Sequence, residues 1–118
     1  MRTDKAYLQD ISNAINSIES FLEGKDREEF FKSDLLQSAV MRKLEIIGEA
    51  TKNLNKELKS KYKNVPWKSA AGMRNFLIHR YFGVNVERVW ETVKKSLPQF
   101  KQQVSGILNE MEQDNAGE

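Results

Sequence analysis

The sequence predicts an all-α domain, an up-and-down bundle of four to five antiparallel helices. Apolar residues recur at three-and-four spacing along almost the whole chain, which is typical of helices that bury one face. The 118 residues include only 2 Pro and 6 Gly, and no segment alternates apolar and polar residues as a strand does. Short links between successive helices favour antiparallel neighbours.

The first helix is expected to begin at Thr3 or Asp4, since either residue can cap it, and to end at Gly24. Helical spacing then places one set of apolar residues on a single face. This set comprises Tyr7, Leu8, Ile11, Ala14, Ile15, Ile18, Phe21 and Leu22.

Residues 25–32 are predicted to form a connection, in which Phe30 and Phe31 pack against the core. A second, longer helix should open at residues 33–34 and end near residues 59–63. The predicted buried face of this helix comprises Leu36, Ala39, Val40, Leu44, Ile47, Thr51, Leu54 and Leu58.

A third helix should start near Pro66, because proline is tolerated at a first helical position, and should be limited by Gly83. Asn85 can cap a fourth helix, and Pro98 either kinks that helix or restarts it with Ser96 as the cap. The apolar stripe of this last part comprises Val86, Val89, Trp90, Val93, Phe100, Val104, Ile107, Leu108 and Met111.

The length of 118 residues fits a single domain, which we expect over residues 1–113, followed by a frayed acidic tail over residues 114–118. No apolar run is long enough to span a membrane, and the start of the chain lacks a signal-peptide core. The expectation is therefore a cytoplasmic protein with no membrane partner.

Charge is unevenly distributed along the chain. Residues 51–80 hold eight Lys or Arg and one acidic residue, whereas residues 1–50 and 81–118 each hold more acidic than basic residues. A local excess of this size can neutralise phosphates, so nucleic acid is a candidate partner. Charge alone nevertheless favours a solvated, lysine-rich helix end.

The chain has no Cys and a single His. A disulfide, a thiol nucleophile and a zinc cage within one chain are therefore excluded, and we expect no cofactor and no metal site. Any chemistry must use other groups.

Several features of the sequence have a possible functional interpretation, but a structural interpretation is favoured for each. Gly48 lies inside a predicted helix at a cost of about 1 kcal/mol against Ala, which indicates that another element packs closely on it. Trp67 and Trp90 lie on apolar faces and are expected in the core rather than as base-stacking platforms. Glu45 and Glu49 share a helix face; both are expected at the surface, with a smaller chance that Glu49 orients a catalytic group.

Polar groups interrupt the apolar helix at residues 74–81, where the chain is most basic. Arg74 is a permanent cation that can bind phosphate through two N–H groups, and His79 can carry a proton near neutral pH. Asn75 lies about 40° from His79 around a helix and can orient its imidazole, and Tyr81 adds a hydroxyl. These are parts for metal-free phosphodiester chemistry, although spacing alone favours a buried, satisfied His and a helix-end Arg.

The run from Arg74 to Tyr81, with His79 five residues after the Arg, resembles the signature of HEPN-domain proteins, specifically HepT-like ribonuclease toxins. The Arg and His spacing is weak by itself, but the resemblance covers roughly residues 5–110. Its further segments are Ile46-Ile47-Gly48-Glu49-Ala50, Val65-Pro66-Trp67, Gly72-Met73-Arg74-Asn75, Val89-Trp90-Glu91 and Leu97-Pro98.

The resemblance implies an all-α homodimer that cleaves RNA without a metal ion, as the toxin of a type VII-like toxin–antitoxin pair. It also implies a cognate antitoxin, a minimal (MNT-type) nucleotidyltransferase that adenylylates Tyr81 to O-AMP-tyrosine.

Cleavage of RNA by its own 2′-OH needs a base, an acid and a cation for the phosphorane charge. We assign phosphate binding and stabilisation of the transition-state charge to Arg74, and proton transfer to His79. Asn75 is expected to orient His79, and Tyr81 is expected to contact the substrate. One chain offers one His, so a two-fold dimer would complete the site. The predicted RNA-binding residues are Lys61, Lys63, Lys68 and Arg80, and the stretch from Lys52 to Lys63 is expected to recruit either RNA or the antitoxin.

Two other functions remain open from the sequence. The first alternative is a non-catalytic nucleotide-binding or adaptor subunit that presents substrate to a nucleotidyltransferase. A purely structural helical dimer is the weaker third possibility. Metal-independent cleavage that is lost on His79→Ala separates the first hypothesis from both.

Overall fold

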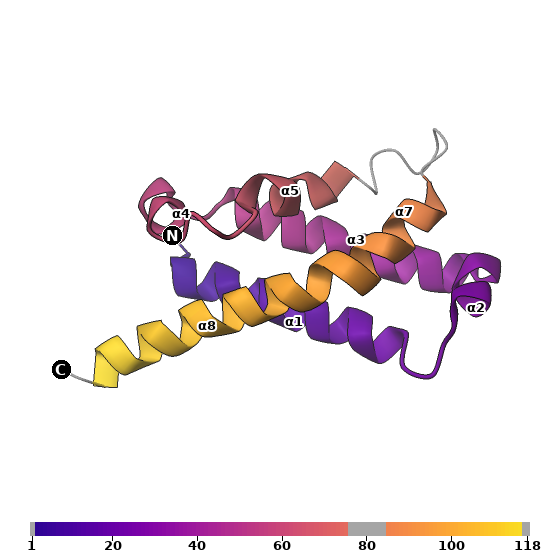
Figure 1. The fold of residues 1–118 in the computed structure, drawn as a ribbon, viewed down its shortest axis with the longest axis horizontal. Coiled ribbons are helices and arrows are strands. Elements are labelled where there is room, and N and C mark those ends of the chain that lie inside the picture. Colours follow the sequence, from indigo (N-terminus) through magenta and orange to yellow (C-terminus); the bar gives the residue numbers. More distant parts are fainter. Residues whose placement is uncertain (1, 76–84, 117–118) are drawn as a thin grey trace.

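A computed structural model of the protein describes residues 2–75 and 85–116. Every regular element within these two ranges is a helix, which confirms the all-α prediction (Figure 1).

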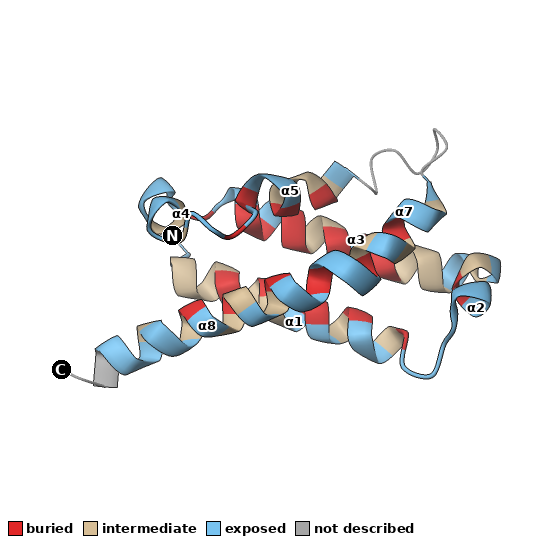
Figure 2. Cartoon of the chain, viewed as in Figure 1, coloured by how far each residue is buried: buried red, intermediate tan, exposed pale blue. Residues whose placement is uncertain are grey.

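Three long helices form the body of the molecule: α1 (Asp4–Phe21), α3 (Asp34–Lys52) and α8 (Leu97–Ala116). Helix α1 packs against both α3 and α8, and the buried parts of all three face one another (Figure 2). Their largest fully buried side chains are Leu8, Ile11, Ile15, Ile18, Val40, Leu44, Ile47, Phe100, Val104 and Ile107.

Helix α1 begins and ends as the sequence predicts. The Thr3 hydroxyl oxygen accepts a hydrogen bond from the Ala6 N–H at 3.1 Å, so this residue is the cap. The chain turns after Leu22, and Gly24 takes the left-handed conformation at φ +72°, which favours glycine.

The prediction that residues 25–32 are only a connection is wrong, because α2 (Arg27–Lys32) forms there. Asp26 accepts a hydrogen bond from the Glu29 N–H at 2.8 Å, and the Glu29 carboxylate accepts one from the Asp26 N–H at 3.3 Å. This capping box stabilises one short turn of helix. Phe30 is fully buried, as expected, with its ring 5.3 Å from the ring of Trp90.

The second predicted helix also ends earlier than expected. Helix α3 stops at Lys52 instead of continuing to residues 59–63, and a separate helix α4 (Lys56–Lys61) follows. The Asp4 carboxylate accepts hydrogen bonds from the Asn55 backbone N–H at 3.0 Å and from the Asn55 side-chain amide at 3.2 Å. A contact between residues 51 apart in sequence thus fixes the break, together with burial of Leu54.

The third region begins where the sequence places it. Pro66 precedes α5 (Trp67–Ala71), which continues into the 3₁₀ turn η1 (Gly72–Arg74). Trp67 is buried, and its indole N–H donates a hydrogen bond to the Tyr62 carbonyl oxygen at 3.0 Å. The predicted limit at Gly83 lies outside the described residues.

The last part of the chain is one bent helical segment. Asn85 caps α7 (Val86–Glu91) by accepting a hydrogen bond from the Arg88 N–H at 3.2 Å. A π-helical segment (Thr92–Ser96) joins α7 to α8, with helical backbone on both sides, so the helix continues without a new cap at Ser96. Such a π-helical turn is a known cause of helix bending.

Helix α8 runs to Ala116, so it extends into the acidic tail that is expected to fray from residue 114. Across the described ranges, no helix is both long and apolar enough to cross a membrane.

Candidate active site

The position of Arg74 depends on the close approach of η1 to α3. A Cβ atom at Gly48, in the middle of α3, would lie 2.4 Å from the Arg74 backbone N and 2.8 Å from the Ala71 carbonyl oxygen. Real side chains do not allow such distances, so the absence of a side chain at Gly48 lets the two backbones pack together. The prediction of close packing on Gly48 is confirmed.

Glu49, the next residue of α3, contacts the Arg74 side chain. Its carboxylate oxygen Oε1 accepts a hydrogen bond from the Arg74 Nη1 at 2.8 Å. This bond is the main cause that lowers the pKa of Glu49 below the usual 4.5; desolvation opposes it, and the charges of Arg74 and Lys52 add to it. Glu49 therefore stays ionised at neutral pH and holds the Arg74 guanidinium; its orientation of a catalytic group stays a prediction.

The Arg74 side chain is only 35% exposed, so the guanidinium is oriented at the surface rather than free in solvent. The bond to Glu49 engages one of the five N–H donors of a guanidinium. A phosphate takes two such donors from one edge of the group. An arginine held in this way is suited to bind a phosphodiester.

Asn75 directly follows Arg74 and is exposed, with helical backbone angles, at the end of the described segment. The other predicted site residues of this run, His79, Arg80 and Tyr81, lie outside the described residues. Their roles, and the orientation of His79 by Asn75, stay predictions.

The predicted RNA-binding lysines all lie at the surface. Lys61 and Lys63 flank Tyr62 at the end of α4, and Lys68 lies in the first turn of α5. Within the described ranges no lysine from position 52 to position 68 is paired with a carboxylate, whereas lysines elsewhere pair with Glu19, Glu28 and Glu29. Ammonium groups without a carboxylate partner are available to phosphates, although that of Lys61 also lies over the Tyr62 ring, 5.5 Å from its centre.

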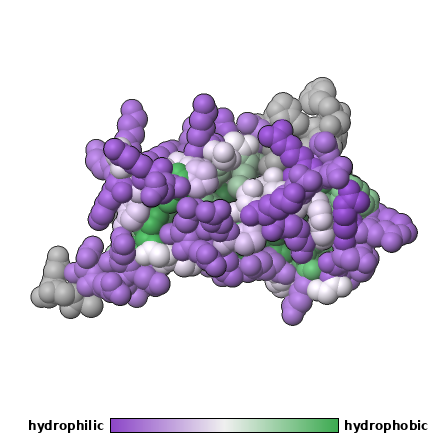
Figure 3. Space-filling model, in the orientation of Figure 1, coloured by the Kyte–Doolittle hydropathy of each residue, from purple (hydrophilic) through white to green (hydrophobic). Residues whose placement is uncertain are grey.

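The surface view agrees with a polar exterior. Most side chains on the face seen in Figure 3 are hydrophilic, and hydrophobic atoms appear only in small areas between them. The two tryptophans are core residues, as predicted: Trp67 is buried and Trp90 packs against the core. Neither forms an exposed platform for stacking bases.

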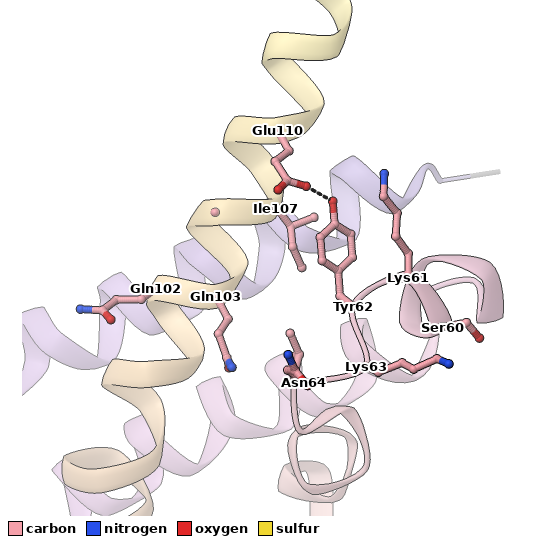
Figure 4. Close-up of a pocket in the computed structure, with 11 residues that line it drawn as sticks. Ser60, Lys61, Tyr62, Lys63, Asn64, Gln102, Gln103, Ile107 and Glu110 are labelled. Carbon is pink, nitrogen blue, oxygen red and sulfur yellow. Dashed lines mark hydrogen bonds between the residues drawn. The ribbon is translucent and has the colours of Figure 1, made fainter.

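One group of residues was not indicated by the sequence. The Tyr62 hydroxyl donates a hydrogen bond to the Glu110 carboxylate of α8, and these two residues line a hollow together with Gln103 (Figure 4). The hydrogen bond with Glu110, followed by burial, raises the pKa of Tyr62 to about 12. No sequence pattern indicates the pair, because its members are 48 residues apart.

Among the described residues, no three or more His, Cys, Asp or Glu side chains are grouped so that they could hold a metal ion.

A family model and several known proteins that resemble this chain indicate the same ribonuclease family. A family model described as "Ribonuclease HepT-like" matches residues 11–107. The chain is 46% identical over 108 residues to a "Putative RNase" of Caldanaerobacter subterraneus subsp. tengcongensis, covering 92% of this chain and 96% of the relative. It is 46% identical over 100 residues to the "Probable ribonuclease HepT" of Thermococcus cleftensis, covering 85% and 91%.

A third relative is longer. The "Gamma-glutamylcyclotransferase and putative RNase" of Methanocaldococcus jannaschii is 45% identical over 115 residues, which are 97% of this chain but 52% of that protein. The present chain thus spans about half of that relative's length. No solved structure gives a significant match.

Proposed function

The chain belongs to the HepT-like ribonuclease family, and from this premise we propose that it is a metal-independent endoribonuclease, the toxin of a type VII-like toxin–antitoxin pair. The observation that carries the proposal is the seating of Arg74: Gly48 brings its backbone against α3, and Glu49 holds its guanidinium at 2.8 Å. Phosphate chemistry requires a cation at a fixed place, and Arg74 is fixed through both its backbone and its side chain.

In the proposed reaction the 2′-hydroxyl of RNA attacks the adjacent phosphorus, and the 5′-oxygen of the next nucleotide departs. Arg74 binds the phosphate and stabilises the charge that develops on its oxygens. His79 transfers the protons, and Asn75 orients it. The products are a 2′,3′-cyclic phosphate and a 5′-hydroxyl.

Such a reaction needs both a base and an acid, while each chain contains one His. We therefore infer a homodimer in which two copies of Arg74 and His79 face each other across one cleft. Leu35, near the start of α3, is 78% exposed and offers an apolar contact to a partner chain.

The proposed control is adenylylation of Tyr81 by a cognate MNT-type nucleotidyltransferase antitoxin. A nucleotide attached two residues from His79 would add bulk and a negative phosphate where the RNA phosphate must lie, and both effects oppose substrate binding. Intact-mass measurement after coexpression with a neighbouring nucleotidyltransferase should show added AMP that is absent in Tyr81→Phe. AMP on another residue would contradict this control.

The direct test of the activity uses purified protein and RNA in excess EDTA. Cleavage should continue in EDTA, yield 2′,3′-cyclic phosphate ends, and disappear in His79→Ala protein of unchanged helical content. Activity that is lost in EDTA and restored by magnesium or manganese would contradict the metal-independent mechanism. Binding of RNA without cleavage would favour the adaptor function instead.

A further inference from the structure

A hollow with a volume of about 580 Å³ lies between the end of α4 and the middle of α8, here called the α4–α8 groove (Figure 4). Its lining includes Lys61, Tyr62, Lys63 and Asn64 on one side and Gln103 and Gly106 on the other. The volume is in the range of ordinary small-molecule sites. The groove shares Lys61 and Lys63 with the predicted RNA-binding residues, but neither Glu49 nor Arg74 lines it.

The side chain of Gln103, which lines the groove, contains a hydrogen-bond acceptor that has no partner. Its amide oxygen Oε1 is buried and has no hydrogen-bond partner. Buried polar atoms are nearly always paired, so a rotation of the Gln103 amide toward the hollow would let a ligand N–H satisfy this acceptor. Figure 4 shows this side chain extending from α8 in the direction of Asn64, whose amide also lines the groove.

The rim supplies positive charge and the walls supply apolar surface. Lys61 and Lys63 lie on the α4 side and are not paired with a described carboxylate, and Val65 and Ile107 contribute apolar atoms to the lining. The one acidic residue of the lining, Glu110, already accepts the hydrogen bond from the Tyr62 hydroxyl. That bond also ties the end of α4 to α8.

A ligand that suits this groove must therefore combine a flat or apolar part, N–H donors beside it and a negative charge. A purely apolar ligand leaves Gln103 unpaired, and a bare phosphate makes no use of the apolar walls. We propose that the α4–α8 groove binds one ribonucleotide unit, with an N–H of the base donating to Gln103 and the phosphate near Lys61 and Lys63.

The nucleotide has two sources, a single-stranded RNA or the free mononucleotide pool. Only the RNA source rests on the proposed function. Arg74 lies nine residues beyond Val65, at the end of η1, and α5 connects the two places. An RNA strand bound at the groove and at Arg74 would be held at two points on the basic part of the surface.

Two variants test the groove without breaking the fold. A Cβ atom at Gly106 would meet nothing within 4 Å, so Gly106→Leu should fill the hollow while keeping α8 intact. Gln103→Leu removes the unmet acceptor at similar volume, and Gln99→Leu, at an exposed position of α8 outside the groove, is its matched control. Circular dichroism verifies that each variant is folded.

The probes are a labelled oligoribonucleotide made uncleavable by 2′-O-methyl groups, the four nucleoside monophosphates, and inorganic phosphate. Gly106→Leu and Gln103→Leu should each weaken nucleotide binding by about tenfold, whereas Gln99→Leu should bind as the unaltered protein does. The RNA source predicts that the oligonucleotide binds at least tenfold more tightly than any monophosphate. Equal affinities support the free nucleotide.

Unchanged nucleotide affinity in both groove variants would overturn the proposal, as would competition by inorganic phosphate as effective as that by nucleotides. Loss of antitoxin binding in Gly106→Leu with unchanged nucleotide affinity would also overturn it, in favour of a protein interface. The readout is binding, so a protein that cleaves no RNA but loses nucleotide affinity in the groove variants would refute the proposed function and keep this inference.

Discussion

Two regions of the molecule meet along α3: the core formed by α1, α3 and α8, and the segment from α4 to η1 (residues 56–74). They differ in how much they bury and in the charge they carry. The core buries large aliphatic and aromatic side chains completely, whereas α4 buries none of its residues. The segment instead contains five Lys and one Arg against a single acidic residue. The core supplies most of the buried surface, and the segment, which adds Trp67 and Met73 to it, carries an excess of positive charge that we propose serves RNA binding and cleavage.

Two adjacent residues of α3 position Arg74 at the contact between the two regions. Because Gly48 has no side chain, η1 can approach α3 closely, and Glu49 accepts a hydrogen bond from Arg74. The rest of the segment is anchored by buried side chains such as Trp67 and Met73. Substitutions on the two sides of this contact should affect different measurements.

The largest effect on stability is expected inside the core. Leu44 is fully buried, and Leu44→Ala should lower the free energy of unfolding by about 2–5 kcal/mol, through lost burial and the cavity that remains. Urea unfolding measures this loss. A change below about 1 kcal/mol would mean that α3 is not packed as described.

A smaller loss of stability is expected for a substitution at the contact itself, but this substitution should also lower RNA cleavage. In Gly48→Ala the added methyl meets backbone atoms of Arg74 and Ala71, which must move, and such overpacking costs about 1–3 kcal/mol. RNA cleavage should fall as well, because Arg74 is displaced. Gly106→Ala, with open space around the new Cβ, is the control and should gain up to about 1 kcal/mol. If Gly48→Ala and Gly106→Ala changed the free energy of unfolding and the cleavage rate equally, the close contact at Gly48 would have no special role.

Removal of the ion pair should change activity modestly and stability hardly at all. Glu49 and Arg74 are both partly exposed, so Glu49→Gln should lower the cleavage rate by at most about fivefold and should leave stability nearly unchanged. Glu45→Gln is the matched control, because Glu45 pairs with Arg42 at 3.1 Å, one turn earlier on α3. Identical rates in the two variants would show that Glu49 does not orient Arg74.

The smallest effect concerns the tie between α4 and α8. The pKa of Tyr62 is raised from 10.0 to about 12, so its hydrogen bond to Glu110 stabilises the fold fully below pH 10. This contribution should be lost as the pH rises through about 12. A titration of phenolate absorbance should place Tyr62 near pH 12, and Glu110→Gln should return it towards 10. A Tyr62 that already titrates near 10 in the unaltered protein would argue against the bond.

The sequence predicted the core well because its signals are local. Three-and-four spacing identified the buried faces of α1, α3 and α8, and single residues such as Thr3 and Asn85 identified caps. The errors arose where distant residues decide. The end of α3 depends on Asp4, and the short helix α2 depends on a capping box that apolar spacing does not reveal.

The candidate site was predicted in the same uneven way. Arg74 and the need for close packing at Gly48 could be read from residue types, and the signature supplied the remaining roles. The assignment of Glu49 as the partner of Arg74 required the crossing of α3 and η1. The α4–α8 groove had no local signal at all, because its two walls come from segments about forty residues apart.

The central claim is that Arg74 serves chemistry and not the fold, and one paired measurement tests it most directly. Turnover of RNA and the free energy of unfolding should be determined on the same preparations of the unaltered protein and Arg74→Ala. We predict a fall in turnover of about 10²–10³, equivalent to roughly 3–4 kcal/mol of transition-state stabilisation, with a change in unfolding free energy below about 1 kcal/mol. An unchanged turnover, or a loss of activity matched by an equal loss of stability, would contradict the claim.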